Sequence, residues 1–144
     1  MGSRDQSANQ LGRSASRSRQ GVAAVEFAVC LPLIVTIVLA SIEASSMVYL
    51  KSCLQTTAYE AARVVAAPNG TPTKAVYRGN EILSQCAVVQ GAVQISPSNS
   101  TSLVVGQQVA VTLTAPVSAN RIIGPWFFNS GNLSARCVFV KEGS

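Results

Sequence analysis

Residues 22–42 read VAAVEFAVCLPLIVTIVLASI, and this stretch decides the architecture that the sequence predicts. Its one charged side chain is Glu26, and Thr36 and Ser41 are its only hydroxyl-bearing residues. Because an α-helix rises about 1.5 Å per residue, roughly 20 such residues cross a bilayer core of ~30 Å. A core helix of a soluble protein would be shorter and would show a polar face. We therefore expect residues 22–42 to form a transmembrane helix.

A basic and polar segment, residues 1–21, precedes this helix. It is rich in Ser, Gln, Arg and Gly, a composition that cannot bury a core and predicts disorder. Its charged residues are Arg4, Arg13, Arg17 and Arg19, with Asp5 as the single acid. Arginines beside a membrane span favour the cytoplasmic side. We expect a cytoplasmic leader over residues 1–21 and an exported domain over residues 43–144.

The helix is expected to continue past the membrane. From Glu43 onward, apolar residues recur at spacings of three and four, which is typical of an amphipathic helix. This stripe comprises Met47, Leu50, Leu54, Ala58, Ala61 and Val65. No Gly or Pro follows Pro32 until residues 68–70, so one helix of about 45 residues is predicted. Two helices with a hinge at residues 45–46 are the alternative, and Pro32 should kink the membrane segment.

The rest of the chain predicts a shorter helix and a small antiparallel sheet. Thr71 is expected to cap a helix that starts at Pro72 and is terminated by Gly91. Val76, Gly79, Leu83 and Cys86 share one face of that helix. Apolar residues then alternate with the period of strands, at Val93 and Ile95, at Val109, Val111 and Leu113, and at Ala135, Cys137 and Phe139. The predicted fold class is α+β, with the long helix packed on the sheet.

The composition argues against an enzyme. The 144 residues include no histidine, the commonest general base and metal ligand, and the six acidic residues form no close pair. The cysteine spacing contains no close ligand pair for zinc. The net charge of +5 comes largely from the leader, and the other basic residues form no stripe. We expect no metal, no cofactor, no small-molecule substrate and no nucleic-acid partner.

The four cysteines and one aromatic cluster receive separate predictions. Cys30 in the span and Cys53 on the continuing helix are expected to be small buried apolar residues. Cys86 and Cys137 both face the core of an exported domain, where a disulfide between them would persist, and two free thiols are the alternative. Residues 126–128, Trp-Phe-Phe, are expected to cap the core, and an exposed contact patch or a position at the membrane interface are the alternatives.

The functional signal lies at the start of the apolar helix. The basic leader ends in Gly21, the helix begins at Val22, and Glu26 and Phe27 follow. An unpaired carboxylate in a bilayer costs at least ~2.5 kcal/mol and needs a partner. Cleavage after Gly21 would create that partner, the α-amino group of Val22. A pair formed between stacked helices would make Glu26 a register device.

This arrangement resembles type IV prepilins. The string of residues 21–28 (GVAAVEFA), together with Leu31-Pro32-Leu33, Ile42-Glu43, Leu54-Gln55 and Glu60-Ala61-Ala62-Arg63, resembles the TadE branch of pseudopilins from the tight-adherence (Tad/Flp) pilus system. The resemblance is strong over residues 19–67. It implies a minor pilin-like subunit that is needed for pilus assembly. The exported domain is larger than that of a bulk Flp pilin, which favours the minor subunit.

The resemblance also implies partners and a location. A prepilin peptidase, an intramembrane aspartic protease facing the cytoplasm, would cut between Gly21 and Val22. Other pilin-like subunits, the pilus assembly machinery and the lipid bilayer would be the remaining partners. The protein would span the bacterial inner membrane once, with its C-terminal domain exported, or would be incorporated in an extracellular pilus.

Two alternatives compete with this interpretation. Residues 38–40, Val-Leu-Ala, resemble a signal-peptidase site, and cleavage there would release a secreted binding domain that starts at Ser41. Without any cleavage, the chain would be a single-pass envelope adaptor. Both alternatives leave Glu26 without a partner.

Overall fold

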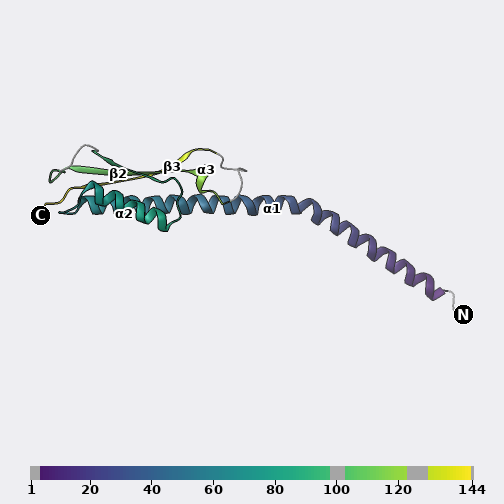
Figure 1. Ribbon diagram of the computed structural model, residues 1–144. Helices are drawn as coiled ribbons and strands as arrows, with labels where there is room; N and C mark the ends of the chain where they lie inside the picture. Colours follow the sequence, from purple (N-terminus) through teal and green to yellow (C-terminus); the bar gives the residue numbers. More distant parts are fainter. Residues whose placement is uncertain (1–3, 98–102, 123–129, 144) are drawn as a thin grey trace. The chain divides into compact units, whose positions relative to one another are not determined.

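The computed structural model describes residues 4–97, 103–122 and 130–143, with side chains from residue 21 onward. Its elements are α1 (Arg4–Ala66), α2 (Pro72–Gln85), β1 (Ala92–Ser96), β2 (Gln108–Pro116), α3 (Val117–Asn120) and β3 (Asn132–Val140) (Figure 1). The long apolar helix, the shorter second helix and the three-stranded antiparallel sheet confirm the predicted α+β, pilin-like arrangement. The chain divides into two compact units, Met1–Ser41 (unit 1) and Ile42–Ser144 (unit 2).

Helix α1 starts earlier than predicted and is not interrupted. It begins at Arg4 rather than at Val22. The leader is helical from Arg4 onward, so the predicted disorder is wrong. The leader contains no proline, and extending an existing helix does not require the costly first turn to be formed again. The helix continues through Pro32 and through Ser45 and Ser46, so the two-helix alternative is not observed. A kink at Pro32 stays a prediction.

The core of unit 2 lies between the second half of α1 and the sheet. The predicted stripe on α1 is confirmed: Met47 is half-buried, and the fully buried members are Leu50, Leu54, Ala58, Ala61 and Val65. At the margin of this core, the rings of Tyr59 and Phe139 meet edge to face with their centroids 5.6 Å apart. This contact joins α1 to β3.

The sheet has the strand order β1-β2-β3, and both pairs are antiparallel. Its inward-facing side chains form two rows across the strands, Ile95–Val111–Cys137 and Val93–Leu113–Ala135. Val109, Val111 and Leu113 are completely buried at the centre, which confirms the predicted alternation in β2. A shift of one residue in register would turn these side chains to the outer face, so their burial fixes the pairing.

Helix α2 begins as predicted. The Thr71 hydroxyl accepts a hydrogen bond from the backbone N–H of Lys74 at 3.3 Å, and Pro72 occupies the first turn. A Cβ atom added to Gly79 would lie 3.1 Å from the Val93 side chain and 3.8 Å from Ala61. Glycine therefore permits α2 to pack closely against both β1 and α1.

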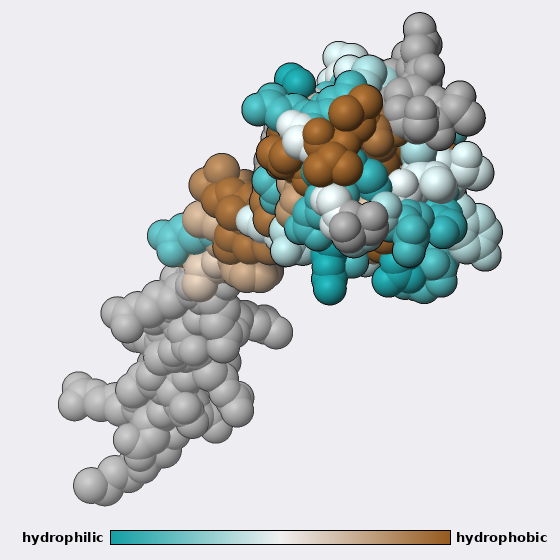
Figure 2. Space-filling view, turned by 90° about the vertical axis from the view of Figure 1, so that its left-hand side faces the viewer, coloured by the Kyte–Doolittle hydropathy of each residue, from teal (hydrophilic) through white to brown (hydrophobic). Residues whose placement is uncertain are grey.

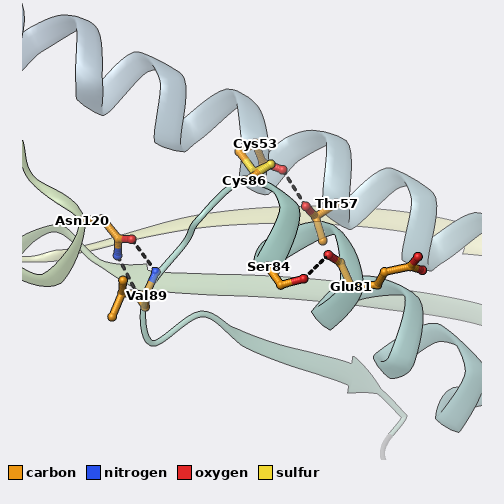
Figure 3. Close-up of a disulfide and its surroundings, with 7 residues drawn as sticks. All are labelled: Cys53, Thr57, Glu81, Ser84, Cys86, Val89 and Asn120. Atoms are coloured by element: carbon orange, nitrogen blue, oxygen red, sulfur yellow. Dashed lines mark hydrogen bonds between the residues drawn. A yellow bond between two sulfur atoms is a disulfide. The ribbon is translucent and has the colours of Figure 1, made fainter.

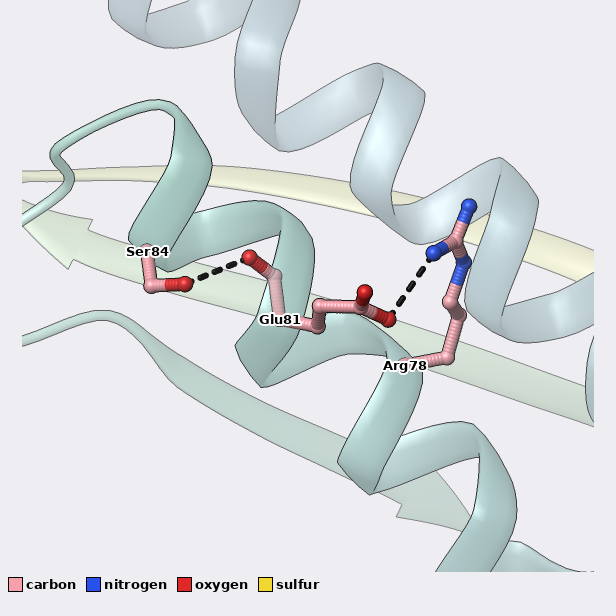
Figure 4. Close-up of polar contacts among 3 residues, drawn as sticks. All are labelled: Arg78, Glu81 and Ser84. Carbon is pink, nitrogen blue, oxygen red and sulfur yellow. Dashed lines mark hydrogen bonds and ion pairs between the residues drawn. The ribbon is translucent and has the colours of Figure 1, made fainter.

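The outer surface of α2 is polar. The Arg78 guanidinium donates to the Glu81 carboxylate at 2.8 Å, and the Ser84 hydroxyl donates to the Glu81 carbonyl at 2.6 Å (Figure 4). Both members of the ion pair are more than a third exposed, so this pair adds little stability. Both residues are half-buried, so the pair lies on the flank of α2 rather than on its most exposed face.

The end of α2 differs from the prediction. The helix stops at Gln85 and not at Gly91, because Ala87 takes a left-handed conformation with a φ of 55°. The Ala87 N–H donates to the Ser84 carbonyl at 3.1 Å, and the Val88 N–H donates to the Leu83 carbonyl at 2.9 Å. These two hydrogen bonds make a Schellman motif, in which glycine usually holds the left-handed position. Because the position holds alanine and not glycine, the sequence did not indicate that α2 ends there.

Candidate processing and assembly site

The residues predicted to carry function lie on an exposed, apolar part of α1. Among the described residues, Gly21–Ala66 is the one segment long and apolar enough to cross a membrane, and its most apolar window is 0% buried. Figure 2 shows apolar side chains, in brown, gathered on the molecular surface. The large ones are Val22, Val25, Phe27, Val29, Leu31, Leu33, Ile34, Val35, Ile37 and Val38. Such a surface requires lipid or other apolar helices around it.

The hydroxyl groups in this segment are satisfied within the helix. The Thr36 hydroxyl donates to the Pro32 carbonyl at 2.7 Å, and the Ser41 hydroxyl donates to the Ile37 carbonyl at 2.8 Å. Neither hydroxyl therefore needs water. Glu26 remains the one charged residue within residues 22–42.

The predicted cleavage site and the carboxylate share one stretch of helix. Gly21, Val22, Glu26 and Phe27 are all helical and exposed. Residues four apart lie on the same face of a helix, so Val22 and Glu26 are neighbours on its surface. A Cβ atom added to Gly21 would meet nothing within 4 Å. Packing against the described side chains, which begin at residue 21, therefore does not require glycine at that position.

The predicted disulfide between Cys86 and Cys137 is wrong. Cys86 is bonded to Cys53, 33 residues earlier, with their Cα atoms 6.6 Å apart. The reason is the placement of α2, which contacts β1 at one edge of the sheet, whereas Cys137 lies on β3 at the other edge. Cys137 is a free, half-buried thiol that packs against the core, and Cys30 is free and exposed.

The disulfide ties the end of α2 to α1 (Figure 3). Beside it, the Thr57 hydroxyl donates to the Cys53 carbonyl at 2.8 Å. The segment after α2 is held by Asn120, whose side chain accepts from the Val89 N–H at 2.7 Å and donates to the Val89 carbonyl at 2.8 Å. Cys53 is buried, as predicted, but it is bonded to Cys86, which the prediction of a simple apolar residue did not include.

The sequence analysis did not predict the burial of two charged residues. Glu43 is 1% exposed at the start of unit 2, where the Ser46 hydroxyl donates to its backbone carbonyl at 2.7 Å. Lys141 is 6% exposed directly after β3. Isolated charged residues usually lie in solvent, so neither residue type nor spacing predicted their burial. Residues 126–128 lie outside the described residues.

Comparison with known proteins gives one match. The model of the family described as TadE-like protein matches residues 21–63, a range that starts at Gly21 and includes Glu26 and Phe27. No curated protein and no solved structure matches the chain. The family suggests a pilin-like structural protein associated with a Tad pilus, and not an enzyme. The chain therefore carries a TadE-like domain at residues 21–63, on the helix that holds every residue of the predicted processing site.

Proposed function

We propose that this protein is a minor pilin-like subunit, a pseudopilin, required for assembly of a Tad/Flp type IV pilus. The observation that carries the proposal is the TadE-like match over residues 21–63, which coincides with an apolar and exposed helix. The second half of that helix shares one hydrophobic core with α2 and the sheet. A subunit of this form offers the helix for insertion and assembly and offers the domain as its exported part.

Maturation by a prepilin peptidase is the second element of the proposal. Water would hydrolyse the peptide bond between Gly21 and Val22, releasing the leader and leaving a free amine on Val22. A glycine inside a helix costs ~1 kcal/mol relative to alanine. Since no packing contact with the described side chains requires Gly21, we infer that the requirement comes from the peptidase, which must approach the backbone there.

Glu26 would then act in assembly. After cleavage, the Val22 amine and the Glu26 carboxylate lie one helical turn apart, and either can pair with its counterpart on a neighbouring subunit. In lipid, an unpaired carboxylate costs several times the thermal energy, about 2.5 kcal/mol or more. The pair can form within one helix or between neighbouring helices. Where it forms between neighbours, the penalty is relieved by the register that brings amine and carboxylate together. Glu26 would therefore select one alignment of adjacent helices.

The proposed topology places the leader in the cytoplasm and unit 2 outside the inner membrane. The four arginines of the leader favour the cytoplasmic side. The bond between Cys53 and Cys86 supports the same orientation, because disulfides persist in the periplasm and outside the cell but are reduced in the cytosol. The prepilin peptidase, other pilin-like subunits and the bilayer are the proposed partners.

The N-terminal sequence of the protein isolated from its native envelope tests the proposal. We expect the chain to start at Val22. A start at Ser41 would instead indicate a secreted domain released by signal peptidase. An uncut N-terminus would indicate an anchored adaptor and would contradict the proposed maturation.

Substitution of Gly21 tests the peptidase requirement directly. We expect Gly21→Phe to block cleavage, because the bulky side chain hinders access to the scissile bond. Gly21→Ala is the matched control, since both side chains point into open space and only their size differs. The measurement is the ratio of precursor to mature protein on a denaturing gel. Equal maturation of Gly21→Phe and wild type would refute the requirement for a small residue.

A further inference from the structure

The Lys141 ammonium lies inside a ring of backbone carbonyl groups. Its Nζ atom donates to the carbonyl oxygens of Val65 at 3.2 Å, Pro68 at 3.3 Å and Gly70 at 3.1 Å, and also to that of Ala67. These carbonyls belong to the last turn of α1 and to the turn that leads into α2. The side chain that reaches them is 6% exposed. A contiguous stretch of backbone therefore surrounds a single positive charge.

The ring is held by hydrogen bonds that do not involve the lysine side chain. The Gly70 N–H donates to the Ala67 carbonyl at 2.8 Å, and the Ala67 N–H donates to the Arg63 carbonyl at 3.2 Å. From the segment that follows β3, the Glu142 N–H donates to the Ala66 carbonyl at 2.9 Å. The shape of the ring is therefore fixed by the turn itself and by the adjacent backbone.

The backbone of Lys141 is also held independently of its ammonium group. Its N–H donates to the Gln107 carbonyl at 2.8 Å, and its carbonyl accepts from the Gly106 N–H at 2.9 Å. Removal of the side chain would leave these hydrogen bonds in place. A truncated residue at position 141 would thus open a space in front of the ring while the ring kept its position.

The ring has the chemistry of a cation site. Carbonyl groups at the C-terminus of a helix carry the negative end of the helix dipole. An ammonium group has three N–H donors, whereas the ring supplies four acceptors. Three of the four oxygens lie 3.1–3.3 Å from Nζ, a spacing that fits an ammonium group and exceeds the ~2.3–2.6 Å of Ca²⁺ coordination. Rings of backbone carbonyls are the ligands that replace the hydration shell of K⁺ in selective channels.

We propose that this carbonyl ring is a binding site for a monovalent cation of the size of ammonium or potassium, and that the chain occupies it with the Lys141 ammonium. The ring is independent of any role in pilus assembly. The protein carries its own cation, so the wild-type domain does not respond to free ammonium or potassium. A chain without the lysine head group takes up the free ion.

Two substitutions of Lys141 separate the effect of losing the positive charge from the effect of opening a space in front of the ring. Lys141→Ala removes the ammonium and opens the site, whereas Lys141→Met removes the ammonium but fills the site with an unbranched apolar chain. Full-length protein in detergent micelles is unfolded with urea, and near-ultraviolet circular dichroism reports the tertiary structure. Ammonium chloride, potassium chloride and tetramethylammonium chloride are compared at equal ionic strength.

We expect Lys141→Ala to be stabilised by ammonium or by potassium and not by tetramethylammonium, which is too large to enter. Binding to the folded state alone raises the folded-to-unfolded ratio roughly tenfold at ten times the dissociation constant. Lys141→Met and wild type should show the same small response to all three salts. If Lys141→Ala does not fold unaided, its refolding yield in ammonium or potassium chloride replaces the unfolding curve.

Lys51→Ala is the matched control. Lys51 also reaches from one element to a backbone carbonyl of another, since its Nζ atom donates to the Ser134 carbonyl, but that contact involves one acceptor. We expect its loss to produce no ion-specific response. An equal response of Lys141→Ala to all three salts, no recovery of folding in any of them, or wild-type stability of both variants at position 141 would overturn the proposal.

Discussion

At the scale of single residues, Ala87 sets the end of α2 in a conformation that suits glycine better. Its φ of 55° lies in the left-handed region, which costs an L-residue roughly 1–2 kcal/mol. We predict that Ala87→Gly stabilises unit 2 by ~1 kcal/mol through relief of this strain. Part of the gain is lost because glycine raises the conformational entropy of the unfolded chain. Urea unfolding of the full chain in micelles measures the change.

The control for Ala87 is the same substitution in a right-handed helical position. Ala44 is exposed and lies in the middle of α1, so Ala44→Gly should cost ~1 kcal/mol through helix propensity alone. The two Ala→Gly variants are therefore expected to change stability in opposite directions. A loss of stability in both would mean that the hydrogen bonds of the Schellman motif do not outweigh the flexibility of glycine.

Gly70 is the residue at which a single added carbon should do the most damage. A Cβ atom there would lie 2.7 Å from the Val65 carbonyl oxygen and 2.9 Å from that of Ala67, and neither backbone group can rotate away. We predict that Gly70→Ala destabilises the domain by ~1–3 kcal/mol, the usual range for overpacking. In Gly143→Ala, the nearest contact would be an ordinary 3.4 Å, so a lowered urea midpoint is expected for Gly70→Ala only.

At the scale of elements, the disulfide joins α1 to α2 and closes a loop of 33 residues. The chain-entropy model assigns such a crosslink ~3–4 kcal/mol. We predict that Cys53→Ala with Cys86→Ala loses this amount, and that reductant lowers the urea midpoint of wild type but not that of the double variant. Cys137→Ala is the control, because it removes a free, half-buried thiol. An unchanged midpoint for reduced wild type would contradict the prediction.

The helices and strands could be predicted from the sequence because their signals are local. The stripe from Met47 to Val65, the Thr71 cap and the alternation in β2 all follow from spacing and residue type. The partner of Cys86 could not be predicted in this way, because it depends on which edge of the sheet α2 covers. Lys141 was missed for a similar reason, since its acceptors lie more than 70 residues away in the sequence.

The candidate processing site was predictable because it needs only one helix. Gly21, Val22, Glu26 and Phe27 are defined by their order along α1 and by the apolar residues around them. The match of the TadE-like family covers the same stretch. The prepilin peptidase and the other proposed partners are separate proteins. The experiments proposed above test their roles.

At the scale of the whole molecule, insertion and assembly should be separable. We predict that Glu26→Ala still inserts in the membrane, because it makes the apolar segment more apolar, but no longer supports pilus assembly. Membrane fractionation measures the first property, and the yield of pili sheared from cells measures the second. Glu60→Ala is the control, since Glu60 lies on α1 within unit 2. Normal pili with Glu26→Ala would contradict the proposed register role.

The crosslink between Cys53 and Cys86 also has a mechanical consequence. When a chain is stretched from its two ends, tension runs through the sulfur–sulfur bond and bypasses the segment between the cysteines, which lie 33 positions apart. An extended residue contributes ~3.3–3.6 Å of length, so the oxidised chain should unravel to a length roughly 100 Å shorter than the reduced chain. Helix α2 would thus bear no load in an oxidising environment, whereas the strands of the sheet would carry it.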